Sequence, residues 1–106
     1  MQLHNHPDML VMGYMVEGRI QAELYSPTGN PLEFEKETIE WEAGTTCWID
    51  GLRTNRRNLH QFTALEDSLF VDILFPDYDE SGRDCQFYRP AEQLGENLFR
   101  LEEVDL

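Results

Sequence analysis

The chain has 106 residues, of which 41% are hydrophobic, 11% aromatic and 27% charged. This length and composition predict a single globular domain over residues 1–106 and exclude a disordered chain. Asp and Glu number 21 against 8 Lys and Arg, which gives a formal net charge of −13. Because such a field repels phosphate groups, we expect neither nucleic acid nor an anionic membrane as a partner.

Targeting and cysteine content indicate the compartment. No apolar run approaches the roughly 20 residues that span a bilayer. The segment from Met1 to Pro7 carries two histidines and lacks the basic region that opens a secretory signal. The two cysteines, Cys47 and Cys85, are too few for a disulfide framework, so we expect reduced thiols. These features predict a cytoplasmic protein, with the nucleus as a second location.

Glycine and proline recur at short intervals and divide the chain into short β-rich segments. In chain order, the expected strands are residues 9–17, 19–25, 32–41, 45–49, 59–64, 68–75 and 98–104. The segment 26–31 has the turn chemistry of a hairpin loop. The segment 90–97 is expected to form one short helical turn. No long amphipathic helix is indicated, so the expected fold class is all-β.

Alternation within these segments predicts which side chains are buried. Apolar residues at every second position from Ile20 to Leu24 have the period of a half-buried strand. In the next segment, Leu32, Phe34 and Ile39 are expected to point inward. Many short strands with regular turns predict a sandwich or a barrel, and closure into a barrel would remove exposed strand edges.

The three histidines of the chain lie in two places. His4 and His6 precede the first strand, and His60 lies in a later one. Residues i and i+2 of an extended segment share a face, so His4 and His6 can bind one ion side by side. His60 can supply a third imidazole from a strand across the barrel, which resembles the facial sites of non-haem iron. The alternative is a surface pair of histidines with no metal.

Three arginines, Arg53, Arg56 and Arg57, lie close together just before His60. They predict a local positive rim beside this histidine in an otherwise acidic chain. The acidic excess elsewhere would either attract a cationic substrate or serve only to keep the protein in solution.

Five motifs follow one another between residues 4 and 89. They are His4-Asn5-His6-Pro7-Asp8-Met9, Tyr14-Met15-Val16-Glu17-Gly18, Asn58-Leu59-His60-Gln61-Phe62-Thr63-Ala64, Val71-Asp72-Ile73-Leu74-Phe75-Pro76-Asp77-Tyr78 and Gly82-Arg83-Asp84-Cys85-Gln86-Phe87-Tyr88-Arg89. In this order they resemble the motifs of the cysteamine dioxygenase and plant cysteine oxidase family of thiol dioxygenases.

The resemblance implies a cupin fold, which is a double-stranded β-helix or jelly-roll barrel. It implies Fe(II) held by His4, His6 and His60, and a reaction that uses O2 to convert a thiol to a sulfinic acid. The family's substrates are cysteamine and the N-terminal cysteine of proteins, so we expect O2 and one of these thiols as partners. Family members have strands before the first histidine motif, which begins here at residue 4. We therefore expect a barrel that lacks N-terminal strands.

Two further residues match positions that the family places near the iron. Asp72 would bind the substrate amine or orient a ligand imidazole, and Tyr78 would donate a hydrogen bond to oxygen or substrate. Their alternatives are a turn cap or an ion pair with Arg83 for Asp72, and simple packing for Tyr78. Some members cross-link the cysteine at position 85 to a tyrosine two residues on. Here that position is Phe87, so no such cross-link of Cys85 is expected.

Other functions remain open at this point. A second hypothesis is a non-catalytic cupin module that binds a metal or a small molecule. A third is another cupin enzyme, such as an isomerase, which would usually keep a Glu where this chain has Leu10 and Val11. A protein without a metal would have its histidines pointing apart. Asp8 also replaces a family glycine, at a place where a left-handed backbone would tolerate Asp less well than Gly.

Overall fold

A computed structural model of the chain describes residues 2–51, 54–75 and 85–104. Within these ranges the chain forms β-strands and no helix, and so it contains no helix long and apolar enough to cross a membrane. The strands are Leu10–Glu17 (β1), Arg19–Pro27 (β2), Glu33–Glu42 (β3), Thr46–Asp50 (β4), Leu59–Ala64 (β5), Leu69–Phe75 (β6), Phe87–Gln93 (β7) and Leu98–Val104 (β8). The expected strands are all present, with small shifts at their ends.

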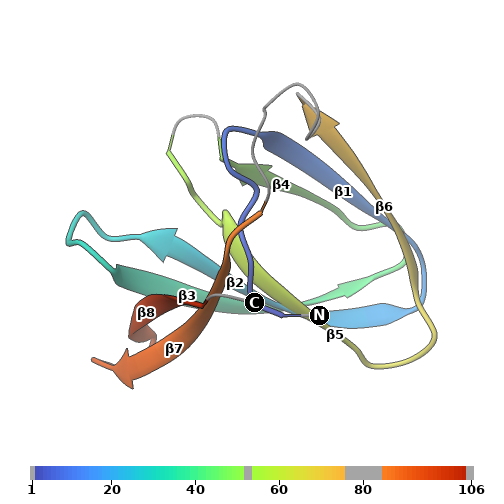
Figure 1. Cartoon of the computed structure of the whole chain (residues 1–106). Helices are drawn as coiled ribbons and strands as arrows, with labels where there is room; N and C mark the ends of the chain where they lie inside the picture. The colour runs from blue at the N-terminus through green and yellow to red at the C-terminus, as the bar shows by residue number, and fades with distance from the viewer. Residues whose placement is uncertain (1, 52–53, 76–84, 105–106) are drawn as a thin grey trace.

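The strands form two antiparallel sheets that face each other (Figure 1). The first has the order β4-β1-β6 and the second the order β5-β2-β3-β8-β7. The main core lies between them, where Val11 and Met15 of β1 pack with Ile20 and Leu24 of β2 and with Phe62 of β5. This two-sheet sandwich confirms the prediction of an all-β, cupin-type fold.

The second sheet also closes on itself through the N-terminal segment. His4 forms β-bridges to both His60 in β5 and Phe87 in β7. The His4 amide donates to the His60 carbonyl at 3.1 Å, and the Tyr88 amide donates to the Leu3 carbonyl at 2.9 Å. Residues 3–5 therefore lie between β5 and β7 and complete a ring. The ring encloses a second, smaller core, which consists of Leu3, Tyr25, Leu59 and Leu101 with Phe34, Tyr88 and Phe99 around them.

Two cores on opposite faces of one sheet explain an unusual burial pattern. Leu24 and Tyr25 are consecutive in β2, and each is only 1% exposed. Successive strand residues point to opposite faces, so Leu24 contributes to the main core and Tyr25 to the smaller one. In β5, Leu59 and His60 divide in the same way. A single strand can therefore supply both a packing residue and a site residue.

Two expectations about the chain are wrong. In place of the expected helical turn over 90–97, residues 90–93 are the end of β7 and residues 94–97 form the bend before β8. Pro90 sits next to a register shift in β7. Proline is tolerated in a strand at such an irregularity because its missing N–H breaks no regular ladder bond there. Leu32 was expected inside but is 53% exposed. Its backbone is left-handed, with φ 63°, because it belongs to the turn before β3.

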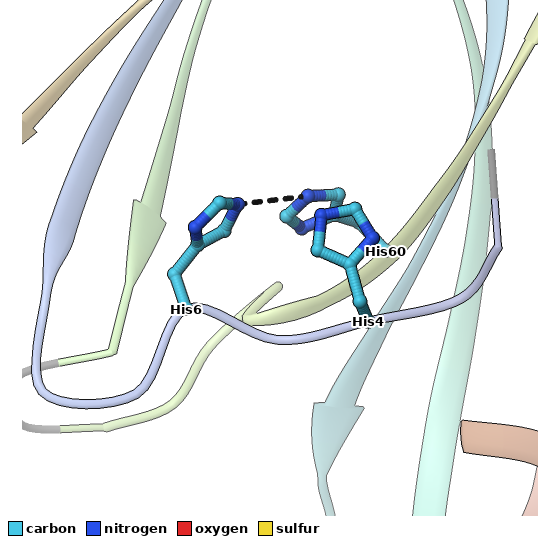
Figure 2. Close-up of side chains that lie close together, drawn as sticks. All are labelled: His4, His6 and His60. Atoms are coloured by element: carbon cyan, nitrogen blue, oxygen red, sulfur yellow. Dashed lines mark hydrogen bonds between the residues drawn. The ribbon is translucent and has the colours of Figure 1, made fainter. Parts of the chain in front are cut away.

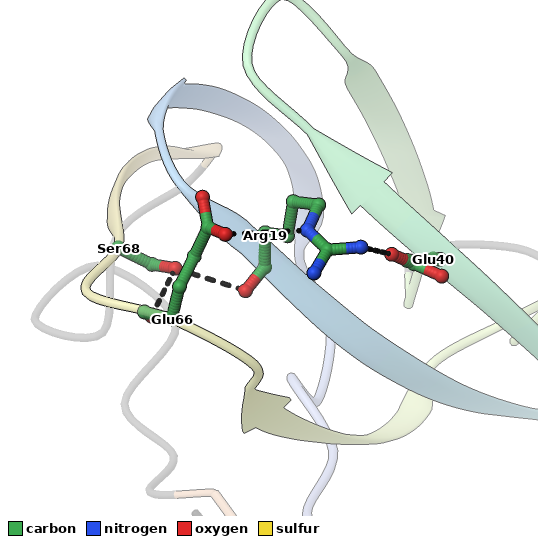
Figure 3. Close-up of polar contacts among 4 residues, drawn as sticks. All are labelled: Arg19, Glu40, Glu66 and Ser68. Carbon is green, nitrogen blue, oxygen red and sulfur yellow. Dashed lines mark hydrogen bonds and ion pairs between the residues drawn. The ribbon is translucent and has the colours of Figure 1, made fainter.

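A polar cluster fixes the turn between β1 and β2 against the loop that follows β5 (Figure 3). Arg19 pairs with Glu40 of β3 and with Glu66, and the Ser68 hydroxyl lies 3.0 Å from the Arg19 carbonyl. Gly18 has φ 86°, and a Cβ there would lie 2.3 Å from the Asp67 carbonyl oxygen. Because the ion pairs are exposed, we expect them to add little stability. The close approach of the Asp67 backbone to Gly18 restricts the sequence of this turn more strongly, because it leaves no room for a side chain at position 18.

The outer face of the first sheet is apolar. Large hydrophobic side chains that are 44–70% exposed line all three of its strands, and they are Tyr14, Val16, Trp48, Leu69, Val71, Ile73 and Phe75. They alternate with inward-facing core residues, and the register places Tyr14 opposite Val71. Many of the acidic residues lie elsewhere, for example along β3. The surface is therefore divided between an apolar face and acidic ones.

The smaller core predicts a specific sensitivity to truncation. Leu101 is fully buried in it, so Leu101→Ala should lower the free energy of unfolding by about 2–5 kcal/mol. Leu69→Ala, at a position 53% exposed, is the matched control and should change it by less than about 0.5 kcal/mol. Urea denaturation measures both. Equal denaturation midpoints for the two variants would show that the ring does not enclose a real core.

Candidate metal centre

The three histidines of the sequence converge on one point between the two sheets (Figure 2). Their candidate ligand nitrogens all lie within 4.8 Å of one another. The Nε2 atoms of His6 and His60 are 3.2 Å apart, and the rings of His4 and His60 have centroids 4.4 Å apart. His60 is 1% exposed and His6 is 6% exposed, while His4 is the most open of the three.

The alternation of side chains along extended segments places His4 and His60 on the same side of the second sheet. Residues 3–5 are extended between β5 and β7, so Leu3 enters the smaller core while His4 points the other way. His60 follows the same rule in β5, where its neighbour Leu59 packs in the smaller core. The backbone bonds of His4 to His60 run in both directions, at 3.1 and 2.9 Å. Two of the three imidazoles are therefore fixed by a single bridge.

Two loop residues position His6. The Asn58 Oδ1 atom accepts the His6 backbone N–H at 2.9 Å, and the Asn58 amide donates to Asn55 Oδ1 at 3.2 Å. Gly51 lies directly beneath this segment, and a Cβ there would be 2.1 Å from the His6 carbonyl oxygen. Asp8 then turns the chain into β1 with φ 58°. The left-handed backbone expected at this position is present, although the residue is not glycine.

Burial keeps the imidazoles of His6 and His60 neutral. It lowers the pKa of His6 to about 4, with His4 adding to the effect. Burial, followed by His4 and His6, lowers the pKa of His60 well below its usual value, and the backbone of Asn58 and Arg57 opposes this lowering. Neutral imidazoles keep a lone pair for a metal ion at physiological pH.

The tautomer of His4 suits the same purpose. Its Nδ1 atom lies 2.8 Å from the Gln2 carbonyl oxygen. A carbonyl only accepts, so this contact assigns the proton to Nδ1 and leaves the Nε2 lone pair of His4 available. A backbone carbonyl that orients a ligand imidazole in this way is a common feature of metal sites.

The donor set fits a divalent transition metal. Nitrogens that share one ion at about 2.1 Å stand about 3.0–3.4 Å apart, and the observed 3.2 Å between His6 and His60 agrees. The Nδ1 atom of His60 is buried with no hydrogen-bond partner, which costs stability and is typical of residues kept for function. Among the described residues no carboxylate joins the three imidazoles, and such a set leaves positions free for other ligands.

Asp72 lies on the inner side of β6, and its register partner in β1 is Gly13. A Cβ on Gly13 would be 3.0 Å from Asp72 Oδ1, so the missing side chain makes room for the carboxylate. Partial loss of water raises the pKa of Asp72, and the nearby His4 lowers it. The structure thus brings Asp72 toward the histidines. Tyr78 and Arg83, which the sequence also singled out, lie outside the described residues.

Both cysteines are free. Cys47 is buried beside Gly13 in the register of β1 and β4, and burial raises the pKa of its thiol to about 11. Cys85 is only half-buried. Sequence patterns assigned no role to Asn58 or Gly51. Asn58 stands inside the histidine motif, but only the folded chain shows that its amide holds His6.

Comparison with known proteins identifies the family of the chain. The sequence profile of the PCO_ADO family, that of cysteamine dioxygenase and the plant cysteine oxidases, matches residues 1–104. The chain belongs to this family. The resemblance seen in the motifs is thereby confirmed, and the family's cupin fold is the one that the two sheets form.

Two of the relatives align with most of the chain and a third with part of it. The "2-aminoethanethiol dioxygenase" of Mus musculus is 32% identical over 120 residues, covering 87% of this chain and 46% of its own length. The "Probable 2-aminoethanethiol dioxygenase" of Dictyostelium discoideum is 27% identical over 100 residues, with the same two coverages. The human protein of the first name is 51% identical over 45 residues, which cover 41% of this chain and 17% of its own length. The chain thus spans about half the length of the first two relatives.

The contact beneath His6 predicts the effect of one added methyl group. Gly51→Ala would place a Cβ 2.1 Å from the His6 carbonyl and 2.7 Å from the Met9 carbonyl, so the ligand segment must shift. We expect the affinity for Co(II) or Fe(II) to fall at least about tenfold, as for changes that disturb ligand orientation. Gly95→Ala meets only an ordinary 3.5 Å contact and should bind like the wild type. Anaerobic titration measures both, and equal affinities would contradict the described packing.

Proposed function

We propose that this protein is an Fe(II)-dependent thiol dioxygenase that converts cysteamine or an N-terminal cysteine to the sulfinic acid. The observation that carries the proposal is the convergence of three imidazoles, two of which, His6 and His60, burial keeps neutral. Within the described residues, no carboxylate belongs to this cluster. Family membership supports the reaction class, and the names of the relatives support cysteamine as a substrate. The overall reaction balances as R–SH + O2 → R–SO2H, with both oxygen atoms transferred to sulfur.

The ligand set explains why a thiol suits this centre. When bound, a divalent iron would favour the thiolate form of the substrate and supply the redox chemistry that O2 requires. His4, His6 and His60 would hold the ion without neutralising its charge, so a negatively charged sulfur is a matching partner. Histidines that served no metal would have pointed apart, whereas these meet in one place.

Asp72 would bind the other end of the substrate. Cysteamine and an N-terminal cysteine share an amine two carbons from the sulfur, and at neutral pH this amine is cationic. A carboxylate on the inner side of β6, close to His4, can accept hydrogen bonds from it and fix the thiol in place. The acidic charge of the chain would also attract such a cation.

Anaerobic loading with Fe(II), followed by O2 and either cysteamine or a cysteine-initiated peptide, tests the activity. Mass spectrometry should find two oxygen atoms added to the thiol. His60→Ala should bind no iron and form no product, because it removes the most deeply buried ligand. Stoichiometric iron with no product would instead indicate a non-catalytic cupin module. Wild-type iron retention in His60→Ala would refute the assigned ligand set.

Asp72→Asn separates substrate positioning from metal binding. The amide has nearly the shape of the carboxylate but lacks its charge, so iron content should match the wild type while turnover falls about 10–100-fold. Iron analysis and product formation are measured on the same preparation. Unchanged turnover would assign Asp72 to a structural role only.

A further inference from the structure

Of the three arginines expected to form a positive rim before His60, Arg57 forms a defined ion pair, and Arg53 lies outside the described residues. The Nε and Nη2 atoms of Arg57 lie 2.8 and 2.9 Å from the two carboxylate oxygens of Glu37 in β3. This fork-to-fork geometry fixes the guanidinium more firmly than a single contact would. Both side chains stay accessible, with 25% of Arg57 and 40% of Glu37 exposed. The pair is therefore held in place but open on one side.

Strand register places this pair beside the metal centre. Leu24 of β2 is opposite Glu37 on one side and opposite His60 on the other. Directly opposed residues share a face, so Glu37 and His60 both face the main core from one row. Each cross-strand step is about 5 Å, which puts the Cα atoms of Glu37 and His60 about 10 Å apart. An extended peptide advances about 3.4 Å per residue, so this spacing corresponds to two or three residues.

A cavity continues outward from the pair. It has a volume of about 430 Å³, and its lining residues are Ser26, Pro27, Glu35, Glu37 and Arg56. Ser26 and Glu35 form the next row on the same face, two residues along from Leu24 and Glu37. The volume lies within the usual range for ligand pockets. The cavity thus begins at Glu37, in the row of His60, and continues to the next row at Ser26 and Glu35.

The chain holds Arg57 at a conformational cost. Its φ is 60°, a left-handed backbone that a non-glycine residue rarely adopts. The Arg57 amide donates to the Ser26 hydroxyl at 2.9 Å, and its side chain also contacts Cys47 on the facing sheet. An ion pair this exposed adds little to stability, so it does not by itself account for the strain. Strained residues of this kind cluster at functional sites.

We propose that the Glu37–Arg57 pair and its cavity form a subsite for the peptide backbone that follows an N-terminal cysteine bound at the three histidines. The inference rests on the proposed function and adds the residues that set its substrate preference. An arginine has five N–H donors, and Glu37 occupies two of them. Donors that remain can bind peptide carbonyl oxygens. Cysteamine has no carbonyl group and is too short to reach the pair.

Binding of two thiols to the Co(II)-loaded protein without O2 tests the subsite. A thiolate–cobalt absorption band reports binding of cysteamine and of a tetrapeptide that begins with cysteine, and it needs no turnover. Arg57→Met keeps the aliphatic stem but removes the donors. We expect it to weaken peptide binding at least about tenfold and to leave cysteamine binding within about twofold of the wild type. Arg57→Lys keeps the charge but not the fork, and should fall between the two.

The control is Arg100→Met in β8, which removes an arginine that is paired with Glu92 at 3.5 Å. This variant should change neither affinity. Equal weakening for both thiols would show that Arg57 only supports the site, and no change for either would also overturn the subsite. The subsite would also be overturned if the Co(II)-loaded protein bound neither thiol. If the peptide-selective loss occurs but O2 yields no product, the subsite stands and the proposed activity fails. Glu37→Gln, which loosens Arg57 without removing it, repeats the test if Arg57→Met does not fold.

Discussion

The structure depends on the short backbone pairing of residues 3–5 with β5 and β7. Reciprocal bonds between His4 and His60, and the bond from Tyr88 to Leu3, tie the start of the chain to strands far along the sequence. Without this pairing the ring around Leu101 would be open, and the imidazoles of His4 and His6 would have no fixed place. Ordering a terminal segment has an entropic cost, and here the burial of Leu3 helps to offset it.

The same segment explains how a site of buried imidazoles is tolerated. Burying His6 and His60 disfavours their charged forms and leaves the His60 Nδ1 atom without a partner. This cost falls where both cores meet, and the packing of Leu59 on one side and Phe62 on the other stabilises β5 around His60. The backbone of Gly51 is also packed closely against the His6 segment, and it leaves no room for a side chain. Stability gained in the two cores therefore supports a centre that is itself unfavourable.

Sequence patterns identified most strands and the three histidines, because alternation and residue type are local properties. The strand Phe87–Gln93 escaped detection because Pro90 reads locally as a break, and only its pairing with β8 and the N-terminal segment makes it a strand. The prediction that Leu32 points inward was wrong for a related reason, since Leu32 belongs to the turn before β3 and not to the alternation of the strand. The Arg57–Glu37 pair joins residues 20 positions apart, so no local pattern reveals it.

Because the outer face of the first sheet is apolar, the net charge of −13 affects how two molecules of this protein approach each other. Two molecules that approach each other feel the repulsion of their charges before apolar surfaces touch. That repulsion extends about 30 Å at 0.01 M salt but only about 3 Å at 1 M. The acidic residues thus act as a colloidal barrier, and ionic strength sets the concentration at which solutions of this protein stay clear.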